Sequence, residues 1–117
     1  MKKVKLSVEI SNIDNEYHYR GIANINKDII KYETLNEEVI FDTRIDRLIK
    51  KEKDKKISID FKNKIMNIEY LSTIINFDIK VYEYAKKEES IYASYSIDDK
   101  TIIELNINII DYLGKEV

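Results

Sequence analysis

The segment Ile103-Glu104-Leu105-Asn106-Ile107-Asn108-Ile109 alternates strictly between apolar and polar residues. Successive side chains of a β-strand point to opposite faces, so this segment predicts a strand with one buried and one solvent-facing side. The same period of two recurs along most of the chain, with almost no helical spacing. In a chain of 117 residues, strands of this kind have to share a single interior, which indicates a small closed barrel or a sandwich.

Along the whole chain, this last segment included, the alternation predicts about eight to ten strands in hairpin succession. The expected inward-facing residues are Val4, Leu6, Val8 and Ile10; Tyr17, Tyr19, Gly21, Ala23 and Ile25; Tyr32; Val39, Phe41, Thr43 and Ile45; Ile57, Ile59 and Phe61; Met66, Ile68 and Tyr70; Ile75, Phe77, Ile79 and Val81; and Ile91, Ala93, Tyr95 and Ile97. Residues 45–56 are ambiguous, and we favour a bent strand with a turn near Lys53-Asp54 over a short helix. We therefore predict one all-β domain, residues 1–117, folded as an antiparallel up-and-down β-barrel.

Composition narrows the classes of function. The chain has no cysteine, which excludes disulfides and thiolate metal sites. Its net charge of −2, with 17 lysines but only three arginines, gives no field that would attract nucleic acid. The start of the chain lacks the apolar stretch of a signal peptide, and no run approaches the roughly 18 apolar residues of a membrane helix. We expect a cytoplasmic protein that binds neither nucleic acid nor membrane.

Codon bias accounts for part of the composition. Isoleucine (23), lysine (17), asparagine (10) and tyrosine (9) are abundant, proline is absent and glycine occurs twice. The abundant residues have AT-rich codons, so we infer an AT-rich bacterial genome. The tyrosines and lysine runs are therefore not by themselves evidence of a binding surface.

The order of several short motifs resembles that of the YwiB-like family, bacterial proteins of unknown function with a calycin, lipocalin-like β-barrel fold. The motifs are Ile30-Lys31-Tyr32-Glu33, Thr43-Arg44-Ile45, Tyr70-Leu71-Ser72, Phe77 to Val81, and the pair Tyr95 and Leu105. The chain departs from the family at Ser72-Thr73-Ile74-Ile75, where a Thr-Pro-aromatic-Gly turn is usual, and at Lys50 to Lys56, where an Arg-Gly turn is usual. The resemblance implies the barrel fold and supplies no catalytic residue.

No catalytic or metal-binding pattern is present in the sequence. His18 is the only histidine, and alternation places it on the outer face, so we expect an ordinary surface residue and no metal site. Six carboxylates alternate with apolar neighbours, so most of them should face water: Glu33, Asp42, Asp60, Glu69, Asp78 and Glu104. We therefore expect a non-enzymatic protein without a cofactor.

The lysine-rich segment Lys50 to Lys56 is interrupted by Glu52 and Asp54. Aromatic residues are not interleaved with its lysines, as they are in single-strand nucleic-acid sites. A solvated turn is therefore the favoured interpretation, with contact to RNA or another anionic partner as the alternative.

Inward-facing hydroxyls are the strongest functional signal in the sequence. They belong to Tyr17, Tyr19, Tyr32, Thr43, Tyr70 and Tyr95, which are expected among phenylalanines and isoleucines. A barrel of about eight strands is just wide enough to be filled by side chains or to hold one small ligand. An apolar cavity with a few hydroxyls is typical of small-molecule sites. These residues either fill the interior or bind a small apolar or aromatic molecule, and the second is our leading functional hypothesis.

The alternative hypothesis is a protein-interaction module with a filled core. Tyr82, Tyr84 and Tyr92 are expected to point outward on two adjacent strands. Together they would form an apolar patch for a partner or for a homodimer.

Overall fold

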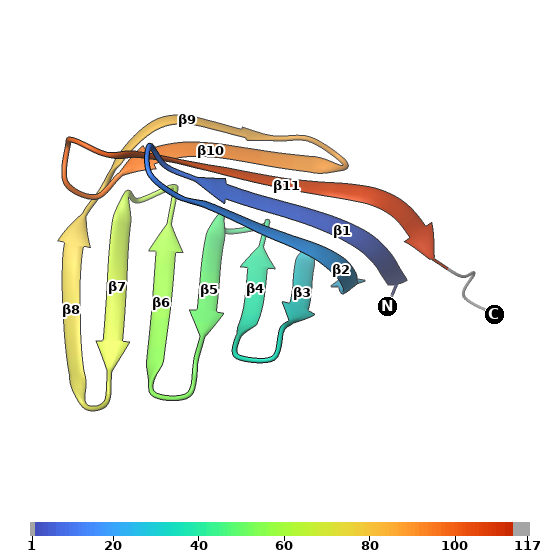
Figure 1. The fold of residues 1–117 in the computed structure, drawn as a ribbon, viewed down its shortest axis with the longest axis horizontal. Helices are drawn as coiled ribbons and strands as arrows, with labels where there is room; N and C mark the ends of the chain where they lie inside the picture. Colours follow the sequence, from blue (N-terminus) through green and yellow to red (C-terminus); the bar gives the residue numbers. More distant parts are fainter. Residues whose placement is uncertain (1, 114–117) are drawn as a thin grey trace. The chain divides into compact units, whose positions relative to one another are not determined.

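The computed structural model describes residues 2–113, and within them the chain forms eleven β-strands and no helix. Figure 1 shows the strands in sequence colours. Their bounds are β1 Lys2–Ser11, β2 Glu16–Asn26, β3 Ile29–Glu33, β4 Glu38–Asp42, β5 Arg47–Lys51, β6 Lys55–Asp60, β7 Ile65–Tyr70, β8 Thr73–Asp78, β9 Lys80–Lys86, β10 Ser90–Ser96 and β11 Ile102–Leu113. No helix of residues 2–113 is therefore long and apolar enough to cross a membrane.

The hydrogen-bonded strand order is β8-β7-β6-β5-β4-β3-β2-β1-β11-β10-β9. Each neighbouring pair is consecutive in sequence except β1 and β11, the first and last strands, which pair antiparallel. In the described part of the chain, β8 and β9 are the two ends of this order and are not hydrogen-bonded to each other. The predicted all-β, antiparallel up-and-down barrel is thus confirmed in nearly closed form, with eleven strands rather than eight to ten.

The chain divides into two compact units, each described here by itself. Residues 23–78 form the first unit, with the end of β2 and strands β3 to β8. Residues 2–22 and 79–113 belong to the second, with β1, most of β2, and β9 to β11. Strand β2 runs from one unit into the other.

Strands β3 to β8 lie side by side and carry two cross-strand rows on one side, which we call the apolar face (Figure 1). One row is entirely apolar: Ile25, Ile30, Phe41, Leu48, Ile59, Met66 and Phe77. The five central members of this row, from Ile30 to Met66, are buried. Phe41 also stacks on Phe61, with ring centroids 6.3 Å apart. The second row is Tyr32, Val39, Lys50, Ile57, Ile68 and Ile75.

The core of the second unit lies on β1, β10 and β11. Val4, Leu6 and Val8 on β1 are almost completely buried, as the alternation predicts. Leu105 on β11 pairs with Ala93 on β10, and both are buried. Strand β10 lies between β9 and β11 and is buried on both faces from Ala93 to Ser96.

Several sequence expectations for the first unit are corrected. Ile45 is exposed rather than inward-facing, because residues 43–46 form a turn that separates β4 from β5. Tyr70 and Ile75 are also exposed, although their strands form as expected. The predicted strand from Ile75 to Val81 is broken at Ile79 into β8 and β9. Residues 45–56 contain no helix, and the turn near Lys53-Asp54 is confirmed.

The predicted tyrosine patch does not form on one face. A β-bulge between Val81 and Glu83 leaves Tyr82 as an extra residue and shifts the alternation of β9. Tyr84 consequently pairs with Ala93 and faces the core side, while Tyr92 pairs with Ala85 on the opposite face. Ile97, expected to face inward, is exposed because it lies in the turn after β10.

Candidate functional site

An ion pair lies within the apolar face of β3 to β8. Lys50 occupies the second row between Val39 and Ile57, and its Nζ lies 3.4 Å from Oε2 of Glu37. The two side chains are only 25% and 16% exposed. A charge removed from water is costly unless it is paired, so each group depends on the other for its place on this face.

Local backbone geometry fixes both members of the pair. Alternation along β5 places Lys50 on the same side as the buried Leu48. Glu37 ends the loop before β4, where its backbone N–H donates to Oγ1 of Thr34 at 3.1 Å. The Thr34 N–H in turn donates to the Glu37 carbonyl at 2.9 Å. These two bonds fix the backbone of Glu37 in the loop before β4, from which its carboxylate reaches Lys50 on β5.

The row that contains Lys50 becomes more accessible toward β8. Tyr32 and Val39 are buried, whereas Ile57 and Ile68 are half-buried. Ile75, at the end of the row on β8, is 54% exposed. An accessible strip of apolar side chains therefore leads up to the Glu37–Lys50 ion pair.

Two of the six predicted site residues share this face. The buried Tyr32 is in the Lys50 row, and Tyr70 lies beyond that row, paired with Lys55 on one side and Thr73 on the other. Three strands separate Tyr32 from Tyr70. Tyr70 is exposed, so it lies at the solvent end of the face rather than in an interior.

The other four predicted site residues lie elsewhere. Thr43 is in the β4–β5 turn, where its hydroxyl donates to the Asp28 carbonyl at 2.8 Å, a contact that joins two hairpin ends. Tyr17 is exposed on β2. Tyr19 is half-buried, and its hydroxyl donates to the Ile22 carbonyl at 3.2 Å.

Tyr95 is the buried tyrosine of the second unit. It pairs with Ile103 and Val81, and burial raises the pKa of its phenol to about 12. At neutral pH this phenol is protonated and can donate a hydrogen bond but cannot act as a base.

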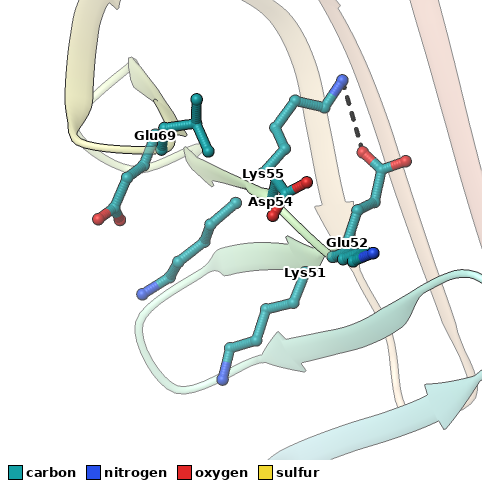
Figure 2. Close-up of a pocket in the computed structure, with 8 residues that line it drawn as sticks. Lys51, Glu52, Asp54, Lys55 and Glu69 are labelled. Carbon is teal, nitrogen blue, oxygen red and sulfur yellow. Dashed lines mark ion pairs between the residues drawn. The ribbon is translucent and has the colours of Figure 1, made fainter.

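The lysine-rich segment surrounds a surface depression of about 370 Å³ (Figure 2). Its lining residues are Lys51, Glu52, Lys53, Asp54, Lys55, Lys56, Glu69 and Leu71. Lys55 points up toward Glu52, with its Nζ 3.4 Å from Oε2, and Lys51 extends the opposite way (Figure 2). Lys51 also pairs with Glu38 at 3.7 Å. Acidic and basic groups alternate around the rim, so the depression does not favour either an anionic or a cationic ligand.

Four of the six outer carboxylates are exposed as expected, whereas the Asp42 side chain is only 15% exposed and Asp60 departs further. Asp60 is buried, with 7% of its surface exposed, although it belongs to the face opposite Leu48 and Ile59. It accepts hydrogen bonds from Asn63 and from the Arg47 guanidinium, whose Nη2 lies 3.0 Å away. His18 is exposed beside Glu16, as predicted. Within residues 2–113, no three His, Asp or Glu side chains gather closely enough to hold a metal ion.

Sequence reasoning missed Glu37 and Lys50. Lys50 was assigned to a solvated turn because the strand between Ile45 and Lys56 was not resolved into β5 and β6. Once β5 is set at Arg47–Lys51, the period of two places Lys50 beside Leu48, so a correct turn at residues 43–46 would have found it.

Comparisons with known proteins identify no relative: no protein-family model, no curated protein and no solved structure matches the chain significantly.

Proposed function

We propose that this protein binds one small apolar or aromatic molecule against the apolar face of β3 to β8 and performs no catalysis. The observation that supports this most is the Glu37–Lys50 ion pair inside an accessible apolar row. Small-molecule sites combine a predominantly apolar surface with a few polar groups that orient the ligand. Ile57 and Ile68 would supply apolar contact, and the ion pair and the Tyr32 hydroxyl would supply orientation.

The half-exposed isoleucines and the Glu37–Lys50 ion pair would contribute to binding in different ways. Covering a half-exposed isoleucine removes apolar surface from water at about 25 cal/mol per Å². An ion pair that is already satisfied contributes little attraction but penalises a ligand that leaves it buried without hydrogen bonds. The apolar strip would therefore provide affinity and the pair would provide selectivity.

Three further assignments belong to this proposal. Membership of the YwiB-like, calycin-type proteins rests on the motifs from Ile30 to Glu33 and from Phe77 to Val81. A bacterial source rests on composition. A cytoplasmic location rests on the absence of cysteine.

A fluorescence titration with N-phenyl-1-naphthylamine, a neutral aromatic probe, tests the proposal. We expect saturable enhancement with one probe per chain. Ile68→Lys should weaken the apparent affinity by about tenfold or more, because it places a charge where apolar contact is proposed.

Ile49→Lys is the matched control. Ile49 is also a half-buried strand isoleucine, but it pairs with Ile40 and Ser58 on the opposite face. Its variant should bind the probe like the wild type, once thermal melts confirm that both variants are folded. Absence of saturable binding, or equal loss in both variants, would contradict the proposal.

A further inference from the structure

Strand β8 lies at one end of the hydrogen-bonded order, with β7 beside it. Within the described residues no other strand pairs with its far edge. The strand is exposed on both faces: Ile74 on the outer side is 61% exposed, and Ile75 on the apolar side is also more than half exposed. Such an edge presents a row of backbone donors and acceptors to any strand that can align with it.

The sequence of β8 is that of an interior strand. From Thr73 to Phe77 it carries no charge, and its first acidic residue is Asp78 at the end. The other strands without charge inside them are β4 and β10, and each of these lies between two hydrogen-bonded neighbours. Proteins usually protect a free edge with lysine, proline or a bulge. The described structure shows none of these between Thr73 and Phe77.

A second copy of β8 can match this edge in a symmetric antiparallel register. In such a pair, side chains on the apolar face of one copy must lie beside side chains on the apolar face of the other. A register with Asn76 opposite Asn76 meets this condition. Ile75 then lies opposite Phe77 of the second copy, on the apolar face. Asp78 lies opposite Ile74 of the second copy, so no like charges meet.

Asn76 gives this register a specific contact. Its Oδ1 already accepts a hydrogen bond from Nδ2 of Asn67 on β7, directly across the strand pair. The amide of Asn76 retains its own donor group. With Asn76 facing its counterpart, the row of asparagine side chains would continue from one copy into the next.

We propose that β8 pairs antiparallel with β8 of a second copy of this chain, with Asn76 opposite Asn76, to form a two-fold symmetric dimer. The β7 and β8 strands of both copies then make one continuous sheet. This interface is isologous, as most homodimer interfaces are. It uses none of the Tyr82, Tyr84 and Tyr92 surface, and it does not depend on the proposed ligand.

Sedimentation equilibrium of the purified chain, from low to several hundred micromolar, tests the dimer. The wild type should show a reversible monomer–dimer equilibrium. Asn76→Lys should raise the dimer dissociation constant by about tenfold or more, because identical charges then face each other across the axis. Asn76→Asp should do the same, and an equimolar mixture of the two variants should dimerise again, since lysine then faces aspartate.

Asn67→Lys is the matched control. It removes the same Asn67–Asn76 hydrogen bond and adds the same charge, but on β7, one strand away from the interface. It should dimerise nearly as well as the wild type. A chain that stays monomeric throughout the range, a dimer that Asn76→Lys does not weaken, or a mixture that does not recover would each overturn the proposal. Pairing of β8 with a different protein would leave the purified chain monomeric and so counts against it.

Discussion

At the level of single residues, Asp60 shows how a buried charge is kept in this fold. Burial opposes ionisation of its carboxyl, but hydrogen bonds from the Asn63 backbone and side chain and the nearby Arg47 guanidinium outweigh that effect and hold the pKa below its usual range. The backbone N–H of Lys62 adds a further bond at 3.1 Å. The carboxylate thereby closes the β6–β7 turn, and its charge contributes to the stability of the hairpin.

Asp60→Asn should lower the free energy of unfolding by about 1–3 kcal/mol at neutral pH, because charge-assisted bonds to a buried carboxylate are lost. The native pKa is lowered, so this stabilisation is complete above the unfolded-state pKa of about 4 and disappears as pH falls through the native pKa. The stability difference between wild type and variant should therefore shrink in acid, as measured by urea denaturation across pH. Asp14→Asn, at an exposed loop position, should change stability little at any pH. A difference that stays constant into acid would contradict this account.

The same residue marks what alternation predicts and what it does not. The period of two assigned Asp60 correctly to the face opposite Ile59. The alternation could not predict that Asp60 is buried on that face. Its burial depends on the turn after β6 and on the side chains that cover the carboxylate. Lys50 is the converse case, since its hydrophilic character suggested solvent while its position in β5 places it on the apolar face.

At the level of strands, most turns were predicted, but the turn at residues 43–46 and the bulge in β9 were not. The turns near Lys27, Asn63 and Asp99 contain Asn or Asp, which tolerate turn geometry and are a sequence signal for turns. The bulge in β9 left no sequence signal, since any residue can be the extra one. This one extra residue places Tyr84 on the other face, so the expected tyrosine patch does not form.

Deletion of Tyr82 should consequently be tolerated. It removes the extra residue, so Val81 keeps its pairing with Tyr95 and Tyr84 keeps its pairing with Ala93. Circular dichroism should show a retained β spectrum and a cooperative melt. Deletion of Tyr92, in the regular central strand β10, should abolish folding, because it would turn one half of the strand over relative to β9 and β11. Loss of structure in the Tyr82 deletion would show that the bulge itself is required.

At the level of the whole molecule, the sequence predicted that first and last strands meet, and β1 and β11 do pair. A meander of half-buried strands leaves fewer exposed edges when its ends join, which favours this pairing. Strand pairing also shows that the break falls between β8 and β9, which no local pattern predicts. Read from β9 round to β8, the strand order is an uninterrupted meander.

A circular permutant that begins at Ile79 and ends at Asp78 should therefore fold. Lys3 and Leu113 are paired across β1 and β11, so a short flexible linker can join the original ends. In the permutant every hydrogen-bonded strand pair becomes consecutive in sequence, and no ladder is cut. We expect a retained β spectrum and a melting temperature within a few degrees of the parent. A permutant opened between Asn106 and Ile107, inside a strand that pairs with both β1 and β10, should not fold. Failure of the first permutant alongside a folded parent would mean that the covalent link between β8 and β9 is needed to hold the structure together.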